Sequence, residues 1–209
     1  KPAQENTGIR FIRTDLKNKP EIKADISNVF STERSTSLRK NNIEVRTVEH
    51  ILAAITGARI DNIIIEIDNI EIPILDGSSK EFSNKINNTG FSIQKSPREY
   101  FEIRKPFTFT DKETGTTLIA TPSENYEINV KINYNSRILG IQDATLNNIS
   151  DFNSEIATSR TFCFLHELEE LLANKLIKGG DLNNAVVIVE NKVTDNKISK
   201  LKKVFNNSE

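Results

Sequence analysis

One stretch decides the fold of this chain: Glu44-Val-Arg-Thr-Val-Glu-His50, followed directly by Ile51-Leu-Ala-Ala-Ile-Thr-Gly57. Thr47 is a favourable helix N-cap residue, because its side-chain oxygen can accept a hydrogen bond from a free backbone N–H of the first turn. The apolar residues that follow recur at helical spacing, namely Val48, Ile51, Leu52 and Ile55. We therefore predict an amphipathic helix that starts after Thr47 and ends at Gly57.

The residues after this helix predict a strand, a turn and a second helix. Ile63-Ile-Ile-Glu-Ile67 is short, β-branched and nearly continuous, which is typical of a buried strand. Asp76-Gly77 is a turn signal. From Ser79 to Asn87 the chain carries apolar residues only at two positions, Phe82 and Ile86. We expect a thin amphipathic helix there, with a single buried stripe.

Strands are predicted on both sides of this central stretch. Before it, Gly8 to Asp15 alternates apolar and polar residues, Glu21 to Val29 does so less strictly, and Ser35 to Leu38 forms a third candidate. After it, the strand candidates are 100–109, 116–121, 126–134 and 184–189, with a hairpin turn at 111–115 and a helix from Leu165 to Asn174.

The pattern changes near residues 91–98, so we predict two domains, 1–94 and 95–209. A weak internal repeat supports this division. The same four features follow one another in each half: an Arg-Thr pair, a helix, a polar pair and a strand. In the first half the two pairs are Arg46-Thr47 and Asp61-Asn62, and in the second they are Arg160-Thr161 and Asn183-Asn184. Repeated units predict two similar layered domains of the α+β class with a site at the seam between them.

Composition narrows the classes of function. The chain has 209 residues, 36% of them hydrophobic, and a net charge of -1, so it lacks the positive field that drives nucleic-acid binding. No apolar run is long enough to cross a bilayer, so we expect no transmembrane segment. The single cysteine, Cys163, fits a reducing compartment, and we expect a cytoplasmic protein. The sequence contains no Met, so we expect a piece of a longer chain.

Glu49 and His50 are the first candidates for chemistry. Neutral imidazole is a good zinc ligand, and a nearby carboxylate can take a proton from water. Neighbours on a helix point about 100° apart, so the two side chains can line two walls of one cleft. The spacing alone is also that of a polar pair at a helix start, and it leaves both interpretations open.

Other candidates are weaker from spacing alone. Asp76-Gly77-Ser78 either orients a substrate hydroxyl or forms a turn and a helix cap. An apolar cluster surrounds Gly179-Gly180 and forms either plain core or a slot for a lipid chain; it comprises Leu165, Leu168, Leu172, Leu176, Ile177 and Leu182. We interpret His166 as a solvated helix residue and Cys163 as a small core residue.

Five motifs in order resemble one family. They are Thr47-Val-Glu-His-Ile-Leu-Ala-Ala54, Ile60-Asp-Asn-Ile63, Glu71-Ile-Pro-Ile-Leu-Asp-Gly-Ser78, Arg160-Thr-Phe162 and Gly179-Gly-Asp-Leu-Asn-Asn-Ala-Val186. Together with Asn6-Thr-Gly-Ile-Arg-Phe11, they resemble the zinc-dependent UDP-3-O-acyl-N-acetylglucosamine deacetylases of lipid A synthesis. The resemblance covers nearly the whole chain. It implies two domains, each a β-sheet layered with two helices, whose helices pack face to face at the seam.

The resemblance also implies residue roles. Glu49 would be the general base and His50 a ligand of Zn2+, while Thr161 would contact the scissile amide oxygen or the intermediate. Phe162, Phe164 and Asp76 would bind the acylated UDP-amino sugar. An acyl passage would be lined by Leu165, Leu168, Leu172, Ile177, Gly180 and Leu182.

The sequence departs from the family pattern at both ends. The family's first strands and its later His-Lys-x-x-Asp zinc ligands are not found in residues 1–209. We therefore expect this polypeptide alone to bind zinc poorly and to hydrolyse little, with the activity belonging to the parent protein. Some relatives carry a fused acyl-carrier-protein dehydratase domain downstream. The alternatives are a non-catalytic module that binds a nucleotide sugar on the same scaffold and a carrier of acyl chains.

Overall fold

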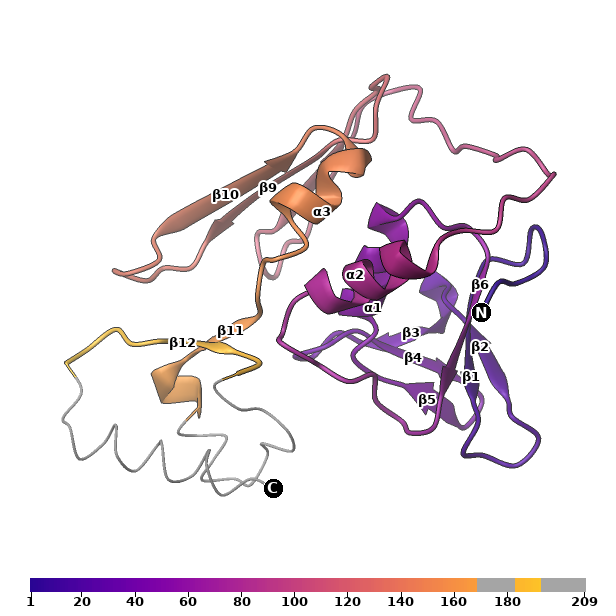
Figure 1. The fold of residues 1–209 in the computed structure, drawn as a ribbon. Helices are drawn as coiled ribbons and strands as arrows, with labels where there is room; N and C mark the ends of the chain where they lie inside the picture. Colours follow the sequence, from indigo (N-terminus) through magenta and orange to yellow (C-terminus); the bar gives the residue numbers. More distant parts are fainter. Residues whose placement is uncertain (169–182, 193–209) are drawn as a thin grey trace.

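The computed structural model describes residues 1–168 and 183–192. Strands and helices are mixed along these described residues (Figure 1), so the predicted α+β class is confirmed. Within the described residues, no helix is both long enough and apolar enough to cross a membrane.

Two small three-stranded sheets form the first half. One sheet has the order β2-β1-β6, built from Glu21–Lys23, Ile9–Arg13 and Ile63–Ile67. Its central strand β1 runs antiparallel to β2 and parallel to β6. The other sheet has the order β3-β4-β5 and is antiparallel, with β3 at Val29–Ser31, β4 at Ser37–Lys40 and β5 at Ile43–Val45.

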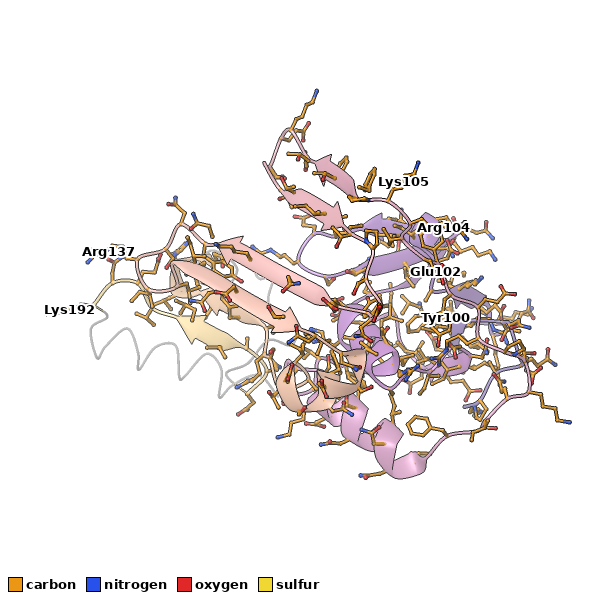
Figure 2. All side chains as sticks on the ribbon, turned by 90° about the horizontal axis from the view of Figure 1, so that it is seen from above. Tyr100, Glu102, Arg104, Lys105, Arg137 and Lys192 are labelled. Atoms are coloured by element: carbon orange, nitrogen blue, oxygen red, sulfur yellow. The ribbon has the colours of Figure 1, made fainter. Side chains whose placement is uncertain are left out.

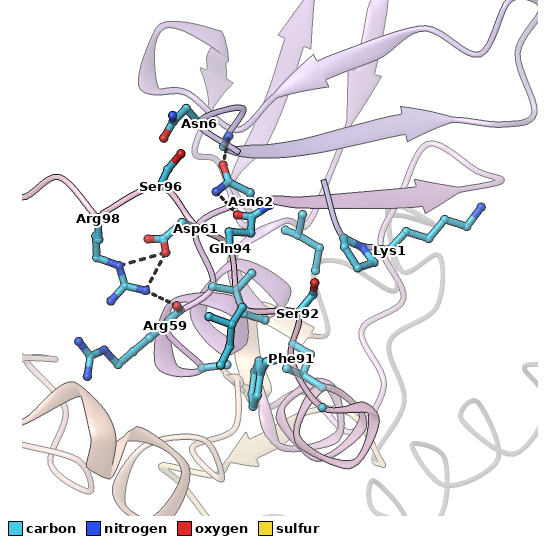
Figure 3. Close-up of a pocket in the computed structure, with 18 of the residues that line it drawn as sticks. Lys1, Asn6, Arg59, Asp61, Asn62, Phe91, Ser92, Gln94, Ser96 and Arg98 are labelled. Carbon is cyan, nitrogen blue, oxygen red and sulfur yellow. Dashed lines mark hydrogen bonds and ion pairs between the residues drawn. The ribbon is translucent and has the colours of Figure 1, made fainter. Parts of the chain in front are cut away.

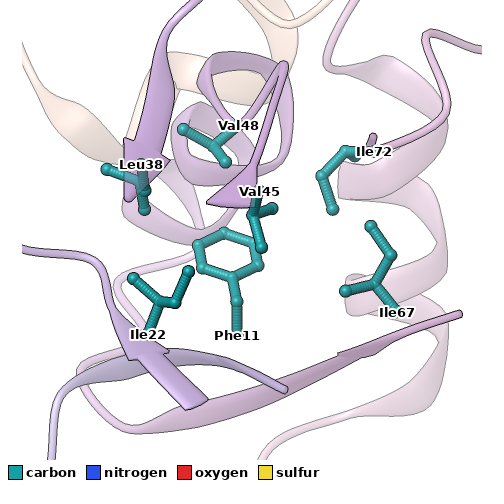
Figure 4. Packing of buried hydrophobic residues seen from close by; sticks show 7 residues of the cluster. All are labelled: Phe11, Ile22, Leu38, Val45, Val48, Ile67 and Ile72. Carbon is teal, nitrogen blue, oxygen red and sulfur yellow. The ribbon is translucent and has the colours of Figure 1, made fainter. Parts of the chain in front are cut away.

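The core of the first half lies between these sheets and the start of helix α1. Figure 4 shows its seven buried side chains, Phe11, Ile22, Leu38, Val45, Val48, Ile67 and Ile72. They come from both sheets, from the start of α1 and from the segment after β6. Because Val48 is fully buried in this cluster, the first turn of α1 is fixed by the core.

Helix α1 spans Glu49–Gly57, but its start differs from the prediction. Val48 is the N-cap residue, without a side-chain cap hydrogen bond, so the assignment of Thr47 as N-cap was wrong. The Thr47 hydroxyl instead donates to Glu71 Oε1 at 2.7 Å, from a backbone with φ of 59°. Gly57 is the last residue of the helix, and a Cβ there would lie 2.2 Å from Phe152 Cδ1. Its role is therefore also to admit the Phe152 ring.

The predicted strand from Glu21 to Val29 was also wrong, because it is broken in the middle. Strand β2 ends at Lys23, and the carboxylate of Asp25 accepts hydrogen bonds from the backbone and hydroxyl of Ser27. This local bond favours the 3-10 turn η1 at Ile26–Asn28, after which the chain enters β3. Side-chain bonding of Asp to the backbone competes here with the sheet ladder.

Helix α2, Lys80–Thr89, packs beside α1, and the chain then leaves the first half through an irregular segment (Figure 1). That segment is bonded back to the first half: Glu5 accepts from the backbone of Lys95 and from Ser96, and Arg98 pairs with Asp61. In Figure 2, Tyr100, Glu102 and Arg104 follow one another along it toward Lys105 and the next strand.

The second half consists of paired strands. Strands β7 (Phe107–Thr110) and β8 (Thr117–Ala120) form the predicted hairpin, and β9 (Ile128–Asn133) pairs with β10 (Ile141–Leu146). Strand β11 (Phe162–Phe164) runs parallel to β12 (Val186–Ile188). The 3-10 turn η2 (Ile149–Asp151) and helix α3 (Phe152–Glu155) connect β10 with β11. The division into domains 1–94 and 95–209 stays a prediction.

One contact between the halves runs through α1. Phe152, Leu146 and Ala157 form a second buried cluster, against which Ala53 of α1 packs. Ala53 and Gly57 are one turn apart, so the helix turns a face of small residues to the second half and a face of larger residues to the first core.

Replacing Phe11 by Ala should lower the free energy of unfolding by about 3–5 kcal/mol, because its fully buried ring would leave a cavity. Ile26 is 90% exposed, so Ile26→Ala is a matched control that should change stability by less than about 0.5 kcal/mol. Urea denaturation followed by circular dichroism measures both. Equal losses in the two variants would contradict the assigned core.

Candidate functional site

Glu49 and His50 lie side by side at the start of α1. The distance from His50 Nε2 to Glu49 Oε1 is 3.9 Å, which is longer than a hydrogen bond. The Glu49 side chain is 35% exposed and that of His50 16%, so both are partly sheltered and still reachable from solvent. This arrangement suits a carboxylate that accepts a proton next to an imidazole that binds a ligand.

The carboxylate of Glu49 is held by the main chain of the neighbouring sheet. The backbone N–H of Thr36, just before β4, donates to Glu49 Oε2 at 2.9 Å. The carbonyl of Thr36 accepts from the backbone N–H of Val48 at 3.2 Å. The start of α1 is therefore bonded to one residue of the sheet through two peptide groups.

The segment from Glu71 to Ser78 connects this site with the second half. At one end Glu71 accepts from Thr47, and the backbone of Arg46 pairs with that of Ile70 and Ile72. At the other end, the backbone N–H of Thr161 donates to the Gly77 carbonyl at 2.8 Å. The structure thus brings the Arg46-Thr47 and Arg160-Thr161 motifs onto opposite ends of one segment.

Arg160 fixes the turn at the far end of that segment. Its Nε donates to the carbonyl of Asp76 at 2.7 Å, and its guanidinium also donates to the carbonyl of Asn183. Gly77 has a φ of 80°, and a Cβ there would lie 1.9 Å from the carbonyl oxygen of Asn184. Glycine is needed for the backbone conformation and for this close approach.

Asp76 is an ionised turn residue. Burial opposes its ionisation, but hydrogen bonds from the hydroxyl and backbone N–H of Ser78, with the charge of Arg160, hold the pKa of Asp76 below its usual value. The structure shows the predicted turn at Asp76, whereas the N-cap residue of α2 is Ser79, without a side-chain cap hydrogen bond. The role of Asp76 in binding substrate stays a prediction.

An aromatic row follows strand β11. The Phe162 ring meets the rings of Tyr134 and Phe164 edge-on, at centroid distances of 5.1 and 5.9 Å, and Phe164 stacks on His166 at 5.4 Å. Sequence reasoning named Phe162 and Phe164 but missed Tyr134. The signal was present, since Tyr134 ends the period-two run that predicted β9.

Of two further side chains near β11, His166 agrees with its interpretation as a solvated helix residue, whereas Cys163 is only partly buried and is not a core residue. His166 is largely exposed, with Nδ1 3.9 Å from Glu190 Oε2. Burial raises the pKa of the Cys163 thiol, and the charge of Glu167 adds to this, so Cys163 is unsuited to act as a thiolate. The charge of Arg34 opposes the rise.

The predicted acyl passage is described only at its beginning. Residues 165–168 are helical, and Leu165 and Leu168 are buried. Leu172, Ile177, Gly180 and Leu182 lie outside the described residues, as does the end of the helix predicted from Leu165 to Asn174.

The described residues supply part of a zinc site. His50 offers an imidazole nitrogen beside the Glu49 carboxylate, whereas a catalytic zinc takes about three protein ligands. In residues 1–168 and 183–192, no group of three or more His, Cys, Asp or Glu side chains is arranged to hold a metal ion. These residues alone therefore do not fit a complete zinc centre.

Two cavities lie away from the Glu49–His50 pair. One, of about 1490 Å³, is lined by both polar and apolar residues of the chain start, of the loop after α1, of α2 and of residues 91–99 (Figure 3). It contains none of the predicted site residues. The other, of about 440 Å³, is mainly apolar and lies between α1, β9, β10 and α3.

Gly77→Ala should destabilise the protein by about 1–3 kcal/mol more than Gly115→Ala, because only at Gly77 would the Cβ overlap a backbone oxygen. Gly115 has a φ of 71° and nothing within 4 Å of its added Cβ, so that variant measures the backbone strain alone, about 1–2 kcal/mol. Thermal unfolding of both variants gives the difference. Equal shifts would contradict the close approach of Gly77 to Asn184.

Asp76→Asn should lower stability at pH 7 by about 1 kcal/mol, and this loss should shrink as the pH falls below the ordinary carboxyl pKa. The folded pKa of Asp76 is depressed, so its charge stabilises the fold above the ordinary value near 3.9, and this contribution is lost as the pH falls through the folded value. Urea unfolding of both proteins between pH 7 and pH 2.5 measures the difference. A constant difference would contradict a charge effect.

Known proteins now place the chain in a family. The family model "UDP-3-O-acyl N-acetylglycosamine deacetylase" matches residues 1–204. A "Bifunctional enzyme LpxC/FabZ" of Bacteroides thetaiotaomicron is 42% identical over 204 residues, covering 98% of this chain and 44% of the relative. A protein of the same name from Porphyromonas gingivalis is 40% identical over 200 residues, covering 96% and 43%.

A "UDP-3-O-acyl-N-acetylglucosamine deacetylase" of Syntrophotalea carbinolica is 40% identical over 191 residues, covering 91% of this chain and 61% of the relative. The chain thus spans about half the length of the curated relatives it matches. The resemblance seen in the motifs is confirmed by the match over nearly the whole chain: this protein belongs to the UDP-3-O-acyl N-acetylglycosamine deacetylase family.

Proposed function

We propose that this chain is part of an enzyme that hydrolyses the N-acetyl amide of UDP-3-O-acyl-N-acetylglucosamine in lipid A synthesis. Water adds to the acetyl carbon, the C–N bond breaks, and the products are acetate and the free amine. The observation that carries the proposal is the Glu49–His50 pair, partly sheltered at the start of α1, in a chain of the deacetylase family.

Glu49 is the proton acceptor in this proposal. A general base must reach the water it activates, and Glu49 is partly exposed, with one carboxylate oxygen fixed by the Thr36 N–H. After C–N cleavage the same group can return the proton to the leaving amine. The charged pair Arg39–Glu44 lies close in sequence, but Glu44 is already paired with Arg39 and Arg46 and is a poor candidate.

Thr161 would stabilise the oxyanion of the tetrahedral intermediate. Its backbone N–H donates to the Gly77 carbonyl, so its hydroxyl is the donor proposed for the substrate. Phe162 and Phe164 would pack against the flat parts of the substrate, and Asp76 would accept from a sugar hydroxyl through its remaining lone pairs. The acyl chain would enter along Leu165 and Leu168.

Zinc is the proposed cofactor, with His50 as one ligand and the remaining ligands outside the described residues. A bound zinc ion would supply Lewis acidity to the amide carbonyl and to water. Binding, orientation and proton transfer are assigned to the side chains named above.

Two further expectations become proposals here. Two relatives are named bifunctional enzymes, which supports a dehydratase domain fused downstream in the parent protein. The single Cys163 supports a reducing compartment, and we propose that the enzyme works in the cytoplasm.

In the full-length protein, Glu49→Ala should reduce acetate release about 10²–10⁴-fold, because it removes the general base. Zinc content and melting temperature should stay unchanged. Glu81→Ala is the matched control, since Glu81 is an exposed carboxylate in the first turn of α2, and its activity should stay within about twofold of wild type.

The outcomes separate the possibilities. If Glu49→Ala keeps full activity with zinc bound, Glu49 is not the base. If the full-length wild-type protein binds the nucleotide sugar but releases no acetate, the non-catalytic binding module replaces the proposed function.

A further inference from the structure

The start of α1 is hydrogen-bonded to both the backbone N–H and the backbone C=O of Thr36, the residue just before β4. The N–H of Thr36 donates to Glu49 Oε2 at 2.9 Å, and the C=O of Thr36 accepts from the N–H of Val48 at 3.2 Å. The first bond ends on a side chain and the second on the main chain. The second bond joins the two backbones, whereas the first restricts the rotation of the Glu49 carboxylate.

The residue that makes this bond is itself rigidly placed. Thr36 directly precedes β4, the central strand of its sheet, and the next two residues, Ser37 and Leu38, are buried. Leu38 pairs with Val45 in the sheet, and both belong to the same core as Val48. The donor on the sheet and the helix that carries the acceptor are therefore fixed by one cluster of apolar side chains.

The two oxygens of Glu49 consequently differ. Oε2 is directed to the Thr36 N–H, and Oε1 is the oxygen nearer to His50 Nε2. A proton acceptor works best when its reactive lone pair already points in the productive direction before the substrate arrives. The loss of conformational entropy on ordering the side chain then does not add to the activation barrier. A free glutamate side chain at a helix start would sample several rotamers.

We infer that the backbone N–H of Thr36 is a positioning group for the reaction: by holding Oε2 of Glu49 it directs Oε1 to the water that is to be deprotonated. The inference rests on the proposed function, because it gives Thr36 a role only if Glu49 is the base. A purely structural bond, which satisfies the backbone N–H of the residue before β4, is the competing interpretation.

The test compares two substitutions at one position in the full-length, zinc-loaded protein. Thr36→Ala and Thr36→Pro both remove the hydroxyl, but only proline removes the N–H, and both keep the carbonyl that accepts from Val48. Relative to Thr36→Ala, the proline variant should lose about tenfold to a hundredfold in kcat, with KM changed by less than about threefold. Zinc content and melting temperature are measured on the same samples.

A second comparison shows whether the effect passes through Glu49. In the Glu49→Ala background, the same exchange of alanine for proline at position 36 should leave the residual rate unchanged, because no carboxylate remains to be oriented. If Thr36→Pro fails to fold, replacing the Thr36 amide by an ester removes the same donor and keeps the side chain, and the same loss in kcat is expected.

The outcomes distinguish the inference from the function on which it rests. If Glu49→Ala abolishes activity but the alanine and proline variants have equal kcat, the inference is overturned and the proposed function stands. An equal loss in the Glu49→Ala background also overturns it, because the effect then bypasses the base. If wild type releases no acetate, the proposed function fails first.

Discussion

The burial of Val48 in the first core is the interaction on which the candidate site depends. Full burial of a valine side chain contributes about 1.5–3 kcal/mol, and Val48 is completely removed from solvent. Because successive helix residues point about 100° apart, this burial turns Glu49 and His50 away from the core. The same constraint explains the backbone before the helix. Thr47 has a φ of 59°, which is unfavourable for a β-branched residue, and its bond to Glu71 helps to hold it there.

The segment from Glu71 to Ser78 carries this constraint to the second half. It is bonded to Thr47 at one end and to Arg160 and Thr161 at the other. Most of these hydrogen bonds are accepted by backbone carbonyl groups, which are present whatever the residue type. What is specific is the conformation: Leu75 and Gly77 both have positive φ, at 54° and 80°, and only glycine admits the backbone of Asn184 so closely.

Local patterns predicted much of the fold and part of the site. Apolar spacing located α1, α2, β1 and β9, while a β-branched run located β6 and neighbouring turn signals helped to locate β8 and β12. These patterns failed where a side chain competes with the backbone, as at Asp25, or where a distant partner decides the cap, as with Glu71 and Thr47. The bond from Thr36 to Glu49 could not be predicted, because a backbone N–H leaves no mark in the sequence. The roles of the acyl-passage residues remain predictions.

The residues proposed for the site rest on parts of the structure that differ in how well they are supported. Glu49 and His50 rest on a core shared by two three-stranded sheets, whereas Thr161, Phe162 and Phe164 rest on or beside the two-stranded pair β11-β12. Two-stranded sheets are marginally stable alone, and β7, β8 and β9 expose large apolar side chains such as Phe107, Leu118 and Val130. Thr161 is held by two backbone hydrogen bonds, one from its N–H to the Gly77 carbonyl and one from the Val186 N–H to its own carbonyl. The residues proposed to bind substrate therefore depend on the first half for part of their geometry.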